Sequence, residues 1–526
     1  MKRKRFIVSI GIVAVTLGVI LSACGDNDAA NESGVQNPGQ GPVSLHILNS
    51  HAGAKYAQQL KADDPYVKEL NRLSGYDIKW EFLGHAQDFT QQLTVRFASK
   101  DLADMIRTTN INASMHAGAV ENGIFTELGP LIDKYGPNLK KMIPQETWNS
   151  PKVSKNGKIY GIPSIVPIPA SNVIYIRQDW LDKLGMKQPK TMDEWKAYFE
   201  GVRKEDLDGN GNPDDEYGLY VREDMVGGDL FFHEFGYHPS EWTLQDGQLQ
   251  PGIIQPEMKE ALKWWKMMYE NKYVNPDLFT LKASDWLAGI SNGKGGSWKY
   301  SFDVANISFS PDKFADKNAK IDLIGGPVGP TGKHGLTPRG DQVYFVWVIP
   351  TSSKKAVEAV KFLDWAWSSP EAQTFFNYGV KDLSYKVENG QIKWDKNDEV
   401  NKADGNSVWV FYQLSINPTN VGTQSPKLFE LQPNKELMMK GMKVAEEEIY
   451  ETDGMSMPAL EAFSTKPELS PGLGNGTMFF DMFAKVVTGK EDLDAAFDKF
   501  VQEWKRRGGD EAIKEATDWY NAFHKQ

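Results

Sequence analysis

The amino-acid sequence predicts an α/β protein with two or three lobes. Its 526 residues exceed the roughly 150 residues of an average domain more than threefold. Residues 43–48 alternate between apolar and polar side chains as in a half-buried strand, and a helix near 66–73 and a strand at 78–82 follow. A continuous apolar run at 343–349 predicts a strand covered on both faces, and a helix is expected from 354 to 367. Strands that alternate with helices are typical of an α/β lobe.

The composition allows large cores. Hydrophobic residues make up 40% of the chain and aromatic residues 12%, including 16 tryptophans, which argues against a disordered protein. Apolar residues between Met258 and Tyr269 recur at helical spacing and predict a packed core helix.

The net charge is −11, and removal of the four cations Lys2 to Arg5 makes the remaining chain more acidic. An acidic surface repels phosphate backbones, so nucleic-acid binding is disfavoured. The single cysteine, Cys24, excludes an intramolecular disulfide and a zinc site built from cysteines.

The N-terminus has the pattern of a secretory signal. Lys2 to Arg5 precede an apolar run from Phe6 to Ala23. The sequence Leu21-Ser22-Ala23-Cys24 resembles the lipobox of bacterial lipoproteins, which implies cleavage before Cys24 and acylation of that cysteine. The alternative is a single transmembrane anchor, because the apolar run is just long enough to span a bilayer. We therefore expect a lipoprotein signal peptide at 1–23 and a lipid anchor, such as palmitate, on the outer face of the cell membrane.

Residues 24–42 are rich in Gly, Asn and Asp and contain one large aliphatic residue, Val35. Such a segment cannot form a core, so it is predicted to be a flexible tether between the anchor and the folded part.

Several blocks of sequence carry a resemblance to a known family. The chain resembles the extracellular solute-binding proteins of carbohydrate ABC importers, particularly the large lipoproteins of Gram-positive bacteria associated with aldouronate and other uronate-containing oligosaccharides. The blocks are 159–163, 173–185, 189–195, 325–330, 344–350, 356–365 and, more weakly, 487–508. The chain departs from the pattern at Tyr378–Asp382, where many relatives carry a Gly-Glu-Gly stretch.

The resemblance implies a periplasmic-binding-protein-like fold of type II, with two lobes joined by crossing strands around a ligand cleft. Mapped onto this sequence, lobe one comprises 43–163 plus 325–370, and lobe two comprises 164–324 plus 371–526. It also implies a monomer that delivers its ligand to permease subunits. The chain has no Walker loop, so the ATPase is expected to be a separate subunit.

Residues 206–216 predict a calcium site. Oxygen-bearing side chains stand at positions 1, 3, 5, 9 and 10 of this segment, with glycine at position 6 for a sharp turn. The segment is similar to the calcium loop of alginate-oligosaccharide-binding proteins. That similarity implies a structural Ca²⁺ held by Asp206, Asp208, Asn210, Asp214 and Asp215, with the carbonyl group of Asn212. The alternative is a surface turn rich in Asx residues that holds no metal.

A sugar site needs aromatic platforms and polar side chains, and ligands of open α/β sheets lie beyond the carboxyl ends of the strands. An arginine such as Arg107, Arg177, Arg222 or Arg339 could hold the carboxylate of an acidic sugar, the alternative being a surface ion pair. Each tryptophan has the alternative of a place in the core. The candidates by this rule are His51, Asp104, Arg107, Trp298, Lys299, Tyr300 and Arg339, with Trp242 and Trp409 as further platforms.

Two features of the sequence bear on whether the protein is an enzyme. Gly289–Gly293 fits Gly-x-Ser-x-Gly, but a helix is predicted before it and a turn after it, whereas a nucleophile elbow needs a strand before it. A glycosidase needs two positioned carboxylates. The chain has 70 acidic residues, so the sequence alone does not exclude such a pair. The sequence therefore predicts a lipid-anchored protein that is not an enzyme and captures an oligosaccharide for an ABC importer. A surface-anchored glycosidase or polysaccharide lyase is the alternative.

Overall fold

The structure is a computed structural model. It describes residues 41–523 apart from 52–54, 85–86, 167, 169, 171, 307, 339–342, 396–397, 402–413, 415–429, 431–433, 459 and 465. The predicted signal peptide and nearly all of the predicted tether lie outside the described residues.

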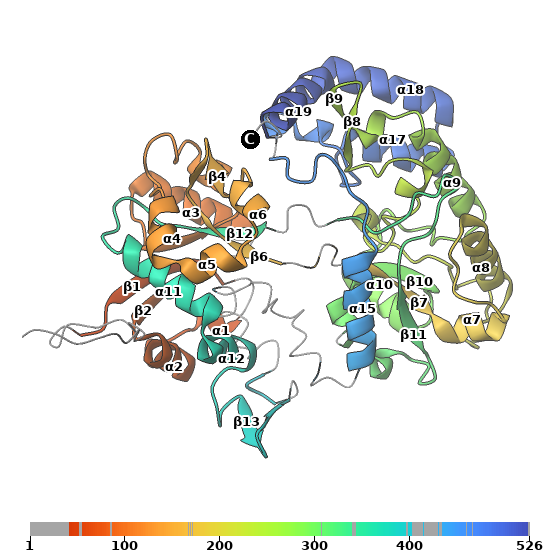
Figure 1. Ribbon diagram of the computed structural model, residues 1–526. Coiled ribbons are helices and arrows are strands. Elements are labelled where there is room, and N and C mark those ends of the chain that lie inside the picture. Colours follow the sequence, from red (N-terminus) through yellow and green to blue (C-terminus); the bar gives the residue numbers. More distant parts are fainter. Residues whose placement is uncertain are drawn as a thin grey trace, which may run out of the picture. The chain divides into compact units, whose positions relative to one another are not determined.

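The first sheet has five strands in the order β2-β1-β3-β12-β6 (Figure 1). Strands β1 and β2 are parallel, as are β1 and β3, whereas β12 runs antiparallel to both β3 and β6. The predicted strands at 43–48, 78–82 and 343–349 are confirmed. The bounds are β1 Ser44–Ser50, β2 Asp77–Leu83, β3 Met105–Thr108, β6 Ile162–Ile165 and β12 Val343–Val348.

Helices with clear end signals pack around this sheet. Asp64 caps the first turn of α2, and Gly75 ends that helix in a left-handed conformation. The buried carboxylate of Asp364 on α11 accepts the backbone N–H groups of Asn138 and Leu139 at the start of α5, at 2.8 and 2.9 Å. The helices are α1 Lys55–Gln58, α2 Pro65–Ser74, α3 Gln87–Ser99, α4 Gly129–Tyr135, α5 Pro137–Met142, α6 Gln145–Asn149, α11 Ala356–Ser368 and α12 Pro370–Tyr378.

The second sheet has three strands in the order β10-β7-β11, with β7 antiparallel to both neighbours. Its core explains many of the tryptophans: Trp180, Trp195, Trp265, Trp286 and Trp298 are all fully buried. The strands are β7 Asn172–Arg177, β10 Ser297–Ser301 and β11 Ile321–Ile324, with separate hairpins β8 Trp242–Gln245 with β9 Gln248–Pro251, and β13 Tyr385–Glu388 with β14 Gln391–Trp394.

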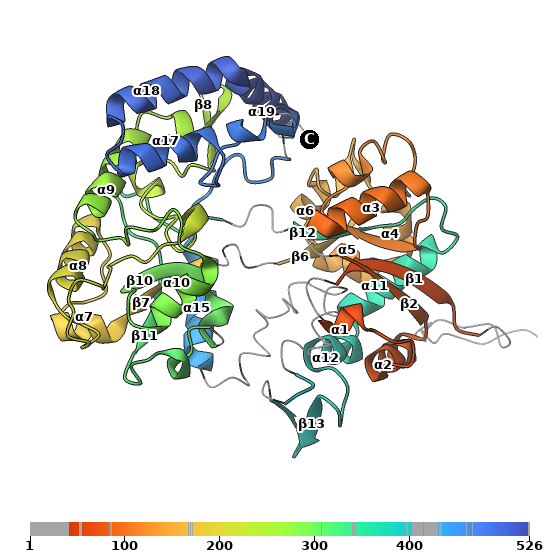
Figure 2. The ribbon, with the colours of Figure 1, turned by 180° about the vertical axis from the view of Figure 1, so that it is seen from behind.

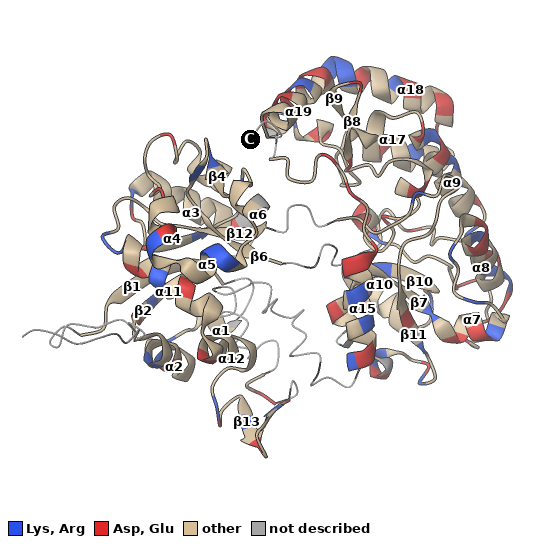
Figure 3. Cartoon of the chain, in the orientation of Figure 1, with Lys and Arg blue, Asp and Glu red and all other residues tan. Residues whose placement is uncertain are grey.

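The predicted core helix is confirmed as α9, which buries Met258, Leu262 and Trp265. On α15, residues of both signs stand side by side (Figure 3), and Lys440 pairs with Asp322 at 2.6 Å. The helices that accompany the second sheet are α7 Gln178–Leu184, α8 Met192–Lys204, α9 Met258–Glu270, α10 Ala283–Ser291, α15 Lys435–Glu447, α16 Glu461–Ser464, α17 Met478–Val487, α18 Leu493–Trp504 and α19 Asp510–Phe523. Among the described residues, no helix combines the length and the apolar character that crossing a membrane requires.

Two segments associate with different elements from those of the predicted lobe division. Residues 325–338 were expected in lobe one, but Val328 bridges to Thr191 and Leu336 bridges to Ile449, beside elements of the second sheet. Residues from 371 were expected in lobe two, but α12 packs against α2 (Figures 1 and 2). The hydroxyl group of Tyr66 on α2 also donates to Ser384 at 3.0 Å. Residues 325–338 therefore belong with the second sheet, and α12 belongs with the first. The expected boundaries at 325 and 371 do not match these contacts.

Candidate functional site

The carboxyl ends of β1 and β3 bring Arg107 together with an exposed aromatic ring. The Nη1 atom of Arg107 donates to Asn49 Oδ1 at 3.3 Å. The guanidinium carbon lies 4.2 Å from the ring centre of Phe345 and 5.9 Å from that of Tyr344. Tyr344 is 52% exposed, and in the described part of the chain it is the one aromatic residue among the exposed large hydrophobic side chains. This edge of the sheet therefore presents a flat ring next to a cation.

Tyr344 was not among the predicted platforms. The strand at 343–349 was expected to be covered on both faces, which holds for Phe345 to Ile349 but not for Tyr344. Strand β12 is antiparallel to β3 and therefore begins beside the carboxyl end of β3. The position of Tyr344 at the start of β12 could thus have indicated a place at the ligand-binding edge of the sheet. His51, which was predicted, follows β1 at the same edge, is half-buried and donates its backbone N–H to the carbonyl group of Leu83.

Asp104 lies at the other end of these strands. It precedes β3, and its carboxylate accepts from the backbone N–H of His46 at 3.0 Å, Ser353 Oγ at 2.8 Å and Lys355 Nζ at 3.1 Å. Burial works to raise the pKa of Asp104, but these donors outweigh it and hold the pKa below its ordinary value. The prediction that Asp104 lies at the carboxyl ends of the strands is therefore wrong, because this residue precedes β3.

The predicted platforms of the second sheet are core residues. Trp298 is fully buried and stacks on Tyr175, with ring centres 5.4 Å apart and planes inclined by 11°. Trp242 is 5% exposed, and its backbone carbonyl accepts from Thr452 Oγ1 at 2.7 Å. The glycine-rich turn before Trp298 suggested exposure, but β10 is buried from Ser297 to Lys299. Neither indole presents a free face for a sugar.

Lys299 and Tyr300 continue β10. Lys299 is 2% exposed, and its Nζ atom contacts Asp229 Oδ2 at 3.0 Å and Thr337 Oγ1 at 2.9 Å. Tyr300 is half-buried, with its ring centre 5.4 Å from that of Trp286. The predicted residues Arg339 and Trp409 lie outside the described residues.

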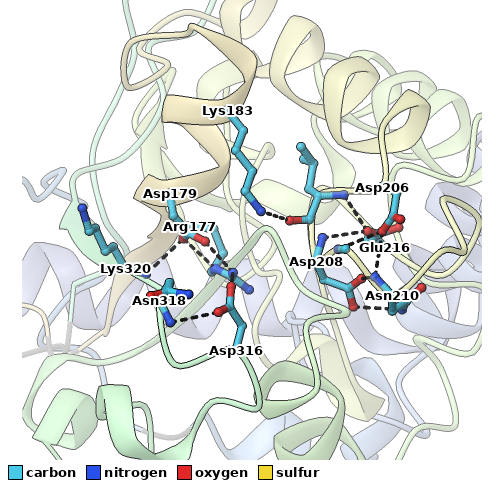
Figure 4. A network of polar contacts seen from close by, with 12 residues as sticks. Arg177, Asp179, Lys183, Asp206, Asp208, Asn210, Glu216, Asp316, Asn318 and Lys320 are labelled. Carbon is cyan, nitrogen blue, oxygen red and sulfur yellow. Dashed lines mark hydrogen bonds and ion pairs between the residues drawn. The ribbon is translucent and has the colours of Figure 1, made fainter.

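Of the further arginines considered for an acidic sugar, Arg177 is a buried structural cation (Figure 4). It is fully buried, pairs with Asp179 at 2.6 Å and lies over the ring of Trp180. Arg222 lies near Trp286, with its guanidinium carbon 5.9 Å from the ring centre. Within the described residues, Arg107 is the arginine that adjoins an exposed aromatic ring at the carboxyl ends of parallel strands.

The segment 206–216 forms a second candidate site, for a cation (Figure 4). Oxygen atoms of Asp206, Asp208 and Glu216 lie within 4.8 Å of one another. Glu216 is fully buried: its Oε1 atom accepts from the N–H groups of Leu207 and Asp208 at 2.9 and 3.1 Å, whereas Oε2 has no hydrogen-bond partner. A buried carboxylate oxygen without a donor is expected where a metal ion completes the site. Glu216, at position 11 of the segment, is not among the ligands that the similarity to calcium loops implies.

The other predicted ligands divide into two groups. Asn210 donates its amide N–H₂ to Asp208 Oδ2 at 2.9 Å and to Asp215 Oδ1 at 3.3 Å, so these side chains gather with Asp206. Asp214 instead pairs with Arg203, and that hydrogen bond lowers the pKa of Asp214. Asn212 stays within the turn, where its N–H donates to Asn210 Oδ1 at 2.7 Å.

The electrostatics of the cluster favour a cation. Burial, together with repulsion from the charges of Asp208 and Asp215, raises the pKa of Glu216 to about 6. Burial, followed by the charges of Asp215 and Asp206, also raises the pKa of Asp208. A divalent cation would relieve this repulsion, and oxygen donors on a bendable loop are the ligands that calcium prefers. The residues present therefore fit Ca²⁺.

Comparison with known proteins identifies the family. The model of the bacterial extracellular solute-binding proteins matches residues 54–374. The chain belongs to this family. Among curated relatives, the polygalacturonan/rhamnogalacturonan-binding protein YtcQ of Bacillus subtilis is 27% identical over 517 residues, which cover 96% of each chain. Lipoprotein LipO of the same organism is 27% identical over 470 residues, covering 87% of this chain and 89% of its own.

Solved structures confirm the predicted type II periplasmic-binding-protein fold. The alginate-binding protein AlgQ2, solved without calcium ion, superposes with a TM-score of 0.65 at 21% identity and covers 91% of this chain and 98% of its own. The HMO-binding, ABC-transporter-associated solute-binding protein of Bifidobacterium longum infantis gives a TM-score of 0.67 at 17% identity and covers 92% of this chain and 99% of its own. At these identities the likeness shows the fold alone.

Proposed function

We propose that this solute-binding protein captures an oligosaccharide outside the cell membrane and delivers it to an ABC importer. The observation that carries the proposal is the exposed ring of Tyr344 next to Arg107 at the carboxyl ends of β1 and β3. A pyranose ring offers an apolar C–H face to such a platform, and its hydroxyl groups accept from a guanidinium. Relatives named for binding polygalacturonan and fructooligosaccharide support a carbohydrate ligand.

The guanidinium of Arg107 also suits a uronate. Arginine donates two parallel N–H bonds to a carboxylate, and aromatic rings beside it help to exclude water. His51 at the same edge, with Lys299 and Tyr300 of β10, remain proposed contacts, as does Arg339 outside the described residues. Because Arg107 supplies this cation, we propose that the ligands include acidic sugars.

Transport would proceed by hinge closure between two lobes. We assign 43–165 with 343–394 to lobe one and 172–338 with 434–523 to lobe two, because the backbone and side-chain contacts of α12 and of residues 325–338 follow this division. A sugar that contacts both lobes stabilises the closed state by its differential affinity, and permease subunits with a separate ATPase would recognise that state. A monomer suffices for this role.

The lipid anchor belongs to the same proposal. Acylation of Cys24 would hold the protein on the outer face of the membrane by the tether 24–42, both outside the described folded part. A relative named as a lipoprotein supports the anchor. The alternative of a surface glycosidase or lyase is less well supported, because the family is one of solute-binding proteins.

A structural Ca²⁺ is proposed for the segment 206–216. Asp206, Asp208, Asn210 and Asp215 would hold it together with Glu216, whose buried Oε2 atom lacks a donor. The alginate-binding protein AlgQ2 was solved without calcium ion, and the substrate-binding protein FusA was solved as an EF-hand mutant; both support calcium at such a loop. In melting experiments, Glu216→Gln should abolish the rise that calcium produces over chelator, whereas the exposed control Glu270→Gln should keep it. An unchanged rise in Glu216→Gln would remove Glu216 from the site.

The ligand is tested with the purified lipoprotein in detergent and calcium. Neutral and uronate-bearing oligosaccharides are screened by thermal shift, where a ligand at 100 times its dissociation constant adds about 2.7 kcal/mol of stability. Arg107→Gln should weaken binding about tenfold, since a hydrogen bond to a charged group contributes about 1.5–3 kcal/mol. Tyr344→Ala should weaken binding by a similar factor, because it removes the aromatic face against which the sugar packs. The matched control is Arg72→Gln, at an exposed ion pair with Glu69. Release of shorter sugars would instead indicate a glycosidase or a lyase.

A further inference from the structure

A pocket of about 400 Å³ lies beside the β8–β9 hairpin and has no role in the sites described above. It is assembled from four separate stretches of the chain, which meet only in the folded protein. Its lining includes His233, Glu241, Lys333, Tyr450, Glu451 and Asp453. This volume lies at the lower end of the range of about 300–1,000 Å³ typical of small-molecule sites.

One wall of the pocket is a rigid pair of rings. His233 and Tyr450 stack with ring centres 3.7 Å apart and planes inclined by 9°. Thr337 neighbours the side chain of Tyr450, and its Oγ1 atom accepts from Lys299 Nζ at 2.9 Å. The stack is therefore tied to β10 of the second sheet and does not need to form when a ligand arrives.

Glu241 fixes the orientation of His233. It is 5% exposed, and its Oε2 atom accepts from His233 Nδ1 at 3.0 Å and from the N–H of His238 at 2.9 Å. A carboxylate accepts only, so Nδ1 carries the hydrogen and the neutral ring keeps Nε2 as an acceptor. Thr243 Oγ1 donates to the other oxygen of Glu241 at 3.2 Å. The wall is thus preorganised and presents acceptors.

The charges around the pocket are mostly negative. Three carboxylates, those of Glu241, Glu451 and Asp453, stand against one ammonium, that of Lys333. The Nζ atom of Lys333 is already bonded to the carbonyl group of Gly236 and lies 4.4 Å from the ring centre of Tyr237. A carboxylate on a ligand would therefore meet like charges, whereas hydroxyl groups would find acceptors.

The pocket does not fit a metal ion. Within the described chain, the carboxylates that converge closely enough on one point are those of Asp206, Asp208 and Glu216, and no such group includes the pocket's acids. Carboxylate acceptors that are spread around a cavity suit a ligand that carries several separate hydrogen-bond donors, such as hydroxyl groups.

We infer that this pocket is a subsite for one neutral sugar unit of the oligosaccharide, packed against the His233–Tyr450 stack, with its hydroxyl groups donating to the carboxylates of Glu241, Glu451 and Asp453. The inference rests on the proposed function and deepens it. Arg107 and Tyr344 on the first sheet accept a uronate, whereas this pocket on the second lobe rejects one. The ligand is then an oligosaccharide that carries a neutral unit as well as any acidic one.

The test compares two probes that differ only in charge. These are α-1,4-linked trigalacturonate and its carboxyl-reduced neutral counterpart, each titrated calorimetrically into the full lipoprotein with calcium. The variant is Glu451→Gln, because this exposed residue can change without disturbing the fold, and Glu241→Gln is the second variant. The matched control is Glu447→Gln on α15, an exposed carboxylate in an ion pair with Lys443.

We expect the ratio of the affinity for the neutral probe to that for the acidic probe to fall at least tenfold in Glu451→Gln and to stay unchanged in Glu447→Gln. If the parent protein binds a probe but the ratio is the same in Glu451→Gln and Glu241→Gln, the subsite is wrong and the oligosaccharide function stands. If the parent protein binds neither these nor the sugars of the wider screen, the proposed function fails and the subsite fails with it.

Discussion

Replacing Glu234 by Gln should stabilise the protein at alkaline pH and not at acid pH. Glu234 is 2% exposed, and its Oε2 atom is buried without a hydrogen-bond partner. Burial raises its pKa from 4.5 to about 7, against the attraction of Lys299. Between these values the folded state keeps a proton that the unfolded chain releases, so the contribution of Glu234 to stability is highest below pH 4.5 and falls until the pH passes 7.

The size of the effect follows from the two pKa values. At 1.36 kcal/mol for each pH unit, ionised Glu234 costs the folded protein about 3 kcal/mol once both states have lost the proton. Gln is nearly isosteric and has no proton to lose, so the variant escapes this cost. The stability of Glu234→Gln relative to the parent should rise by about 2–3 kcal/mol between pH 5 and pH 8.5.

The assay is urea unfolding followed by tryptophan fluorescence at pH 5, 7 and 8.5, on parent and variant side by side. All other titrating groups are common to both proteins, so their contributions cancel in the difference. Glu447→Gln serves as the control at an exposed carboxylate. A difference for Glu234→Gln that stays constant within about 0.5 kcal/mol, roughly the additivity limit, would refute the reasoning.

Three further predictions concern other parts of the chain. Gly293→Val should reduce the melting rise produced by calcium, because a Cβ atom there would lie 2.7 Å from Asp208 Oδ2 and the backbone φ is +89°; an unchanged rise would show that the turn yields. Trp298→Ala should cost about 3–5 kcal/mol in urea unfolding, as for other buried tryptophans, and a cost below about 1 kcal/mol would contradict its place in the core. Cys24→Ala should abolish incorporation of labelled palmitate and release the protein from membranes, and continued labelling would disprove acylation at this residue.

Local sequence patterns predicted the strands and helices well. The runs at 43–48 and 343–349 became β1 and β12, and the helical spacing from Met258 became α9. Alternation and helical periodicity are patterns of neighbouring residues, so a short window of sequence is enough to predict these elements. The acidic loop was predictable for the same reason, since its ligands lie within eleven consecutive residues.

Exposure was predicted poorly where it depends on distant segments. Trp298 follows a glycine-rich turn, yet it stacks on Tyr175 from another strand and has no exposed surface. Asp104 precedes its strand and is held there by Lys355, about 250 positions further along the chain. Tyr344 sits in an apolar run, yet its ring remains exposed.

By itself, the sequence determined the α/β class, the resemblance to a solute-binding family and the position of the acidic loop, because each is written in residues close together along the chain. Only the tertiary structure decided that Tyr344 stands beside Arg107, that Glu216 turns a buried oxygen toward the acidic cluster, and that His233 stacks on Tyr450. These pairings join segments up to about 240 residues apart or depend on which face of a strand is covered. Long-range packing sets both, and no local pattern encodes it.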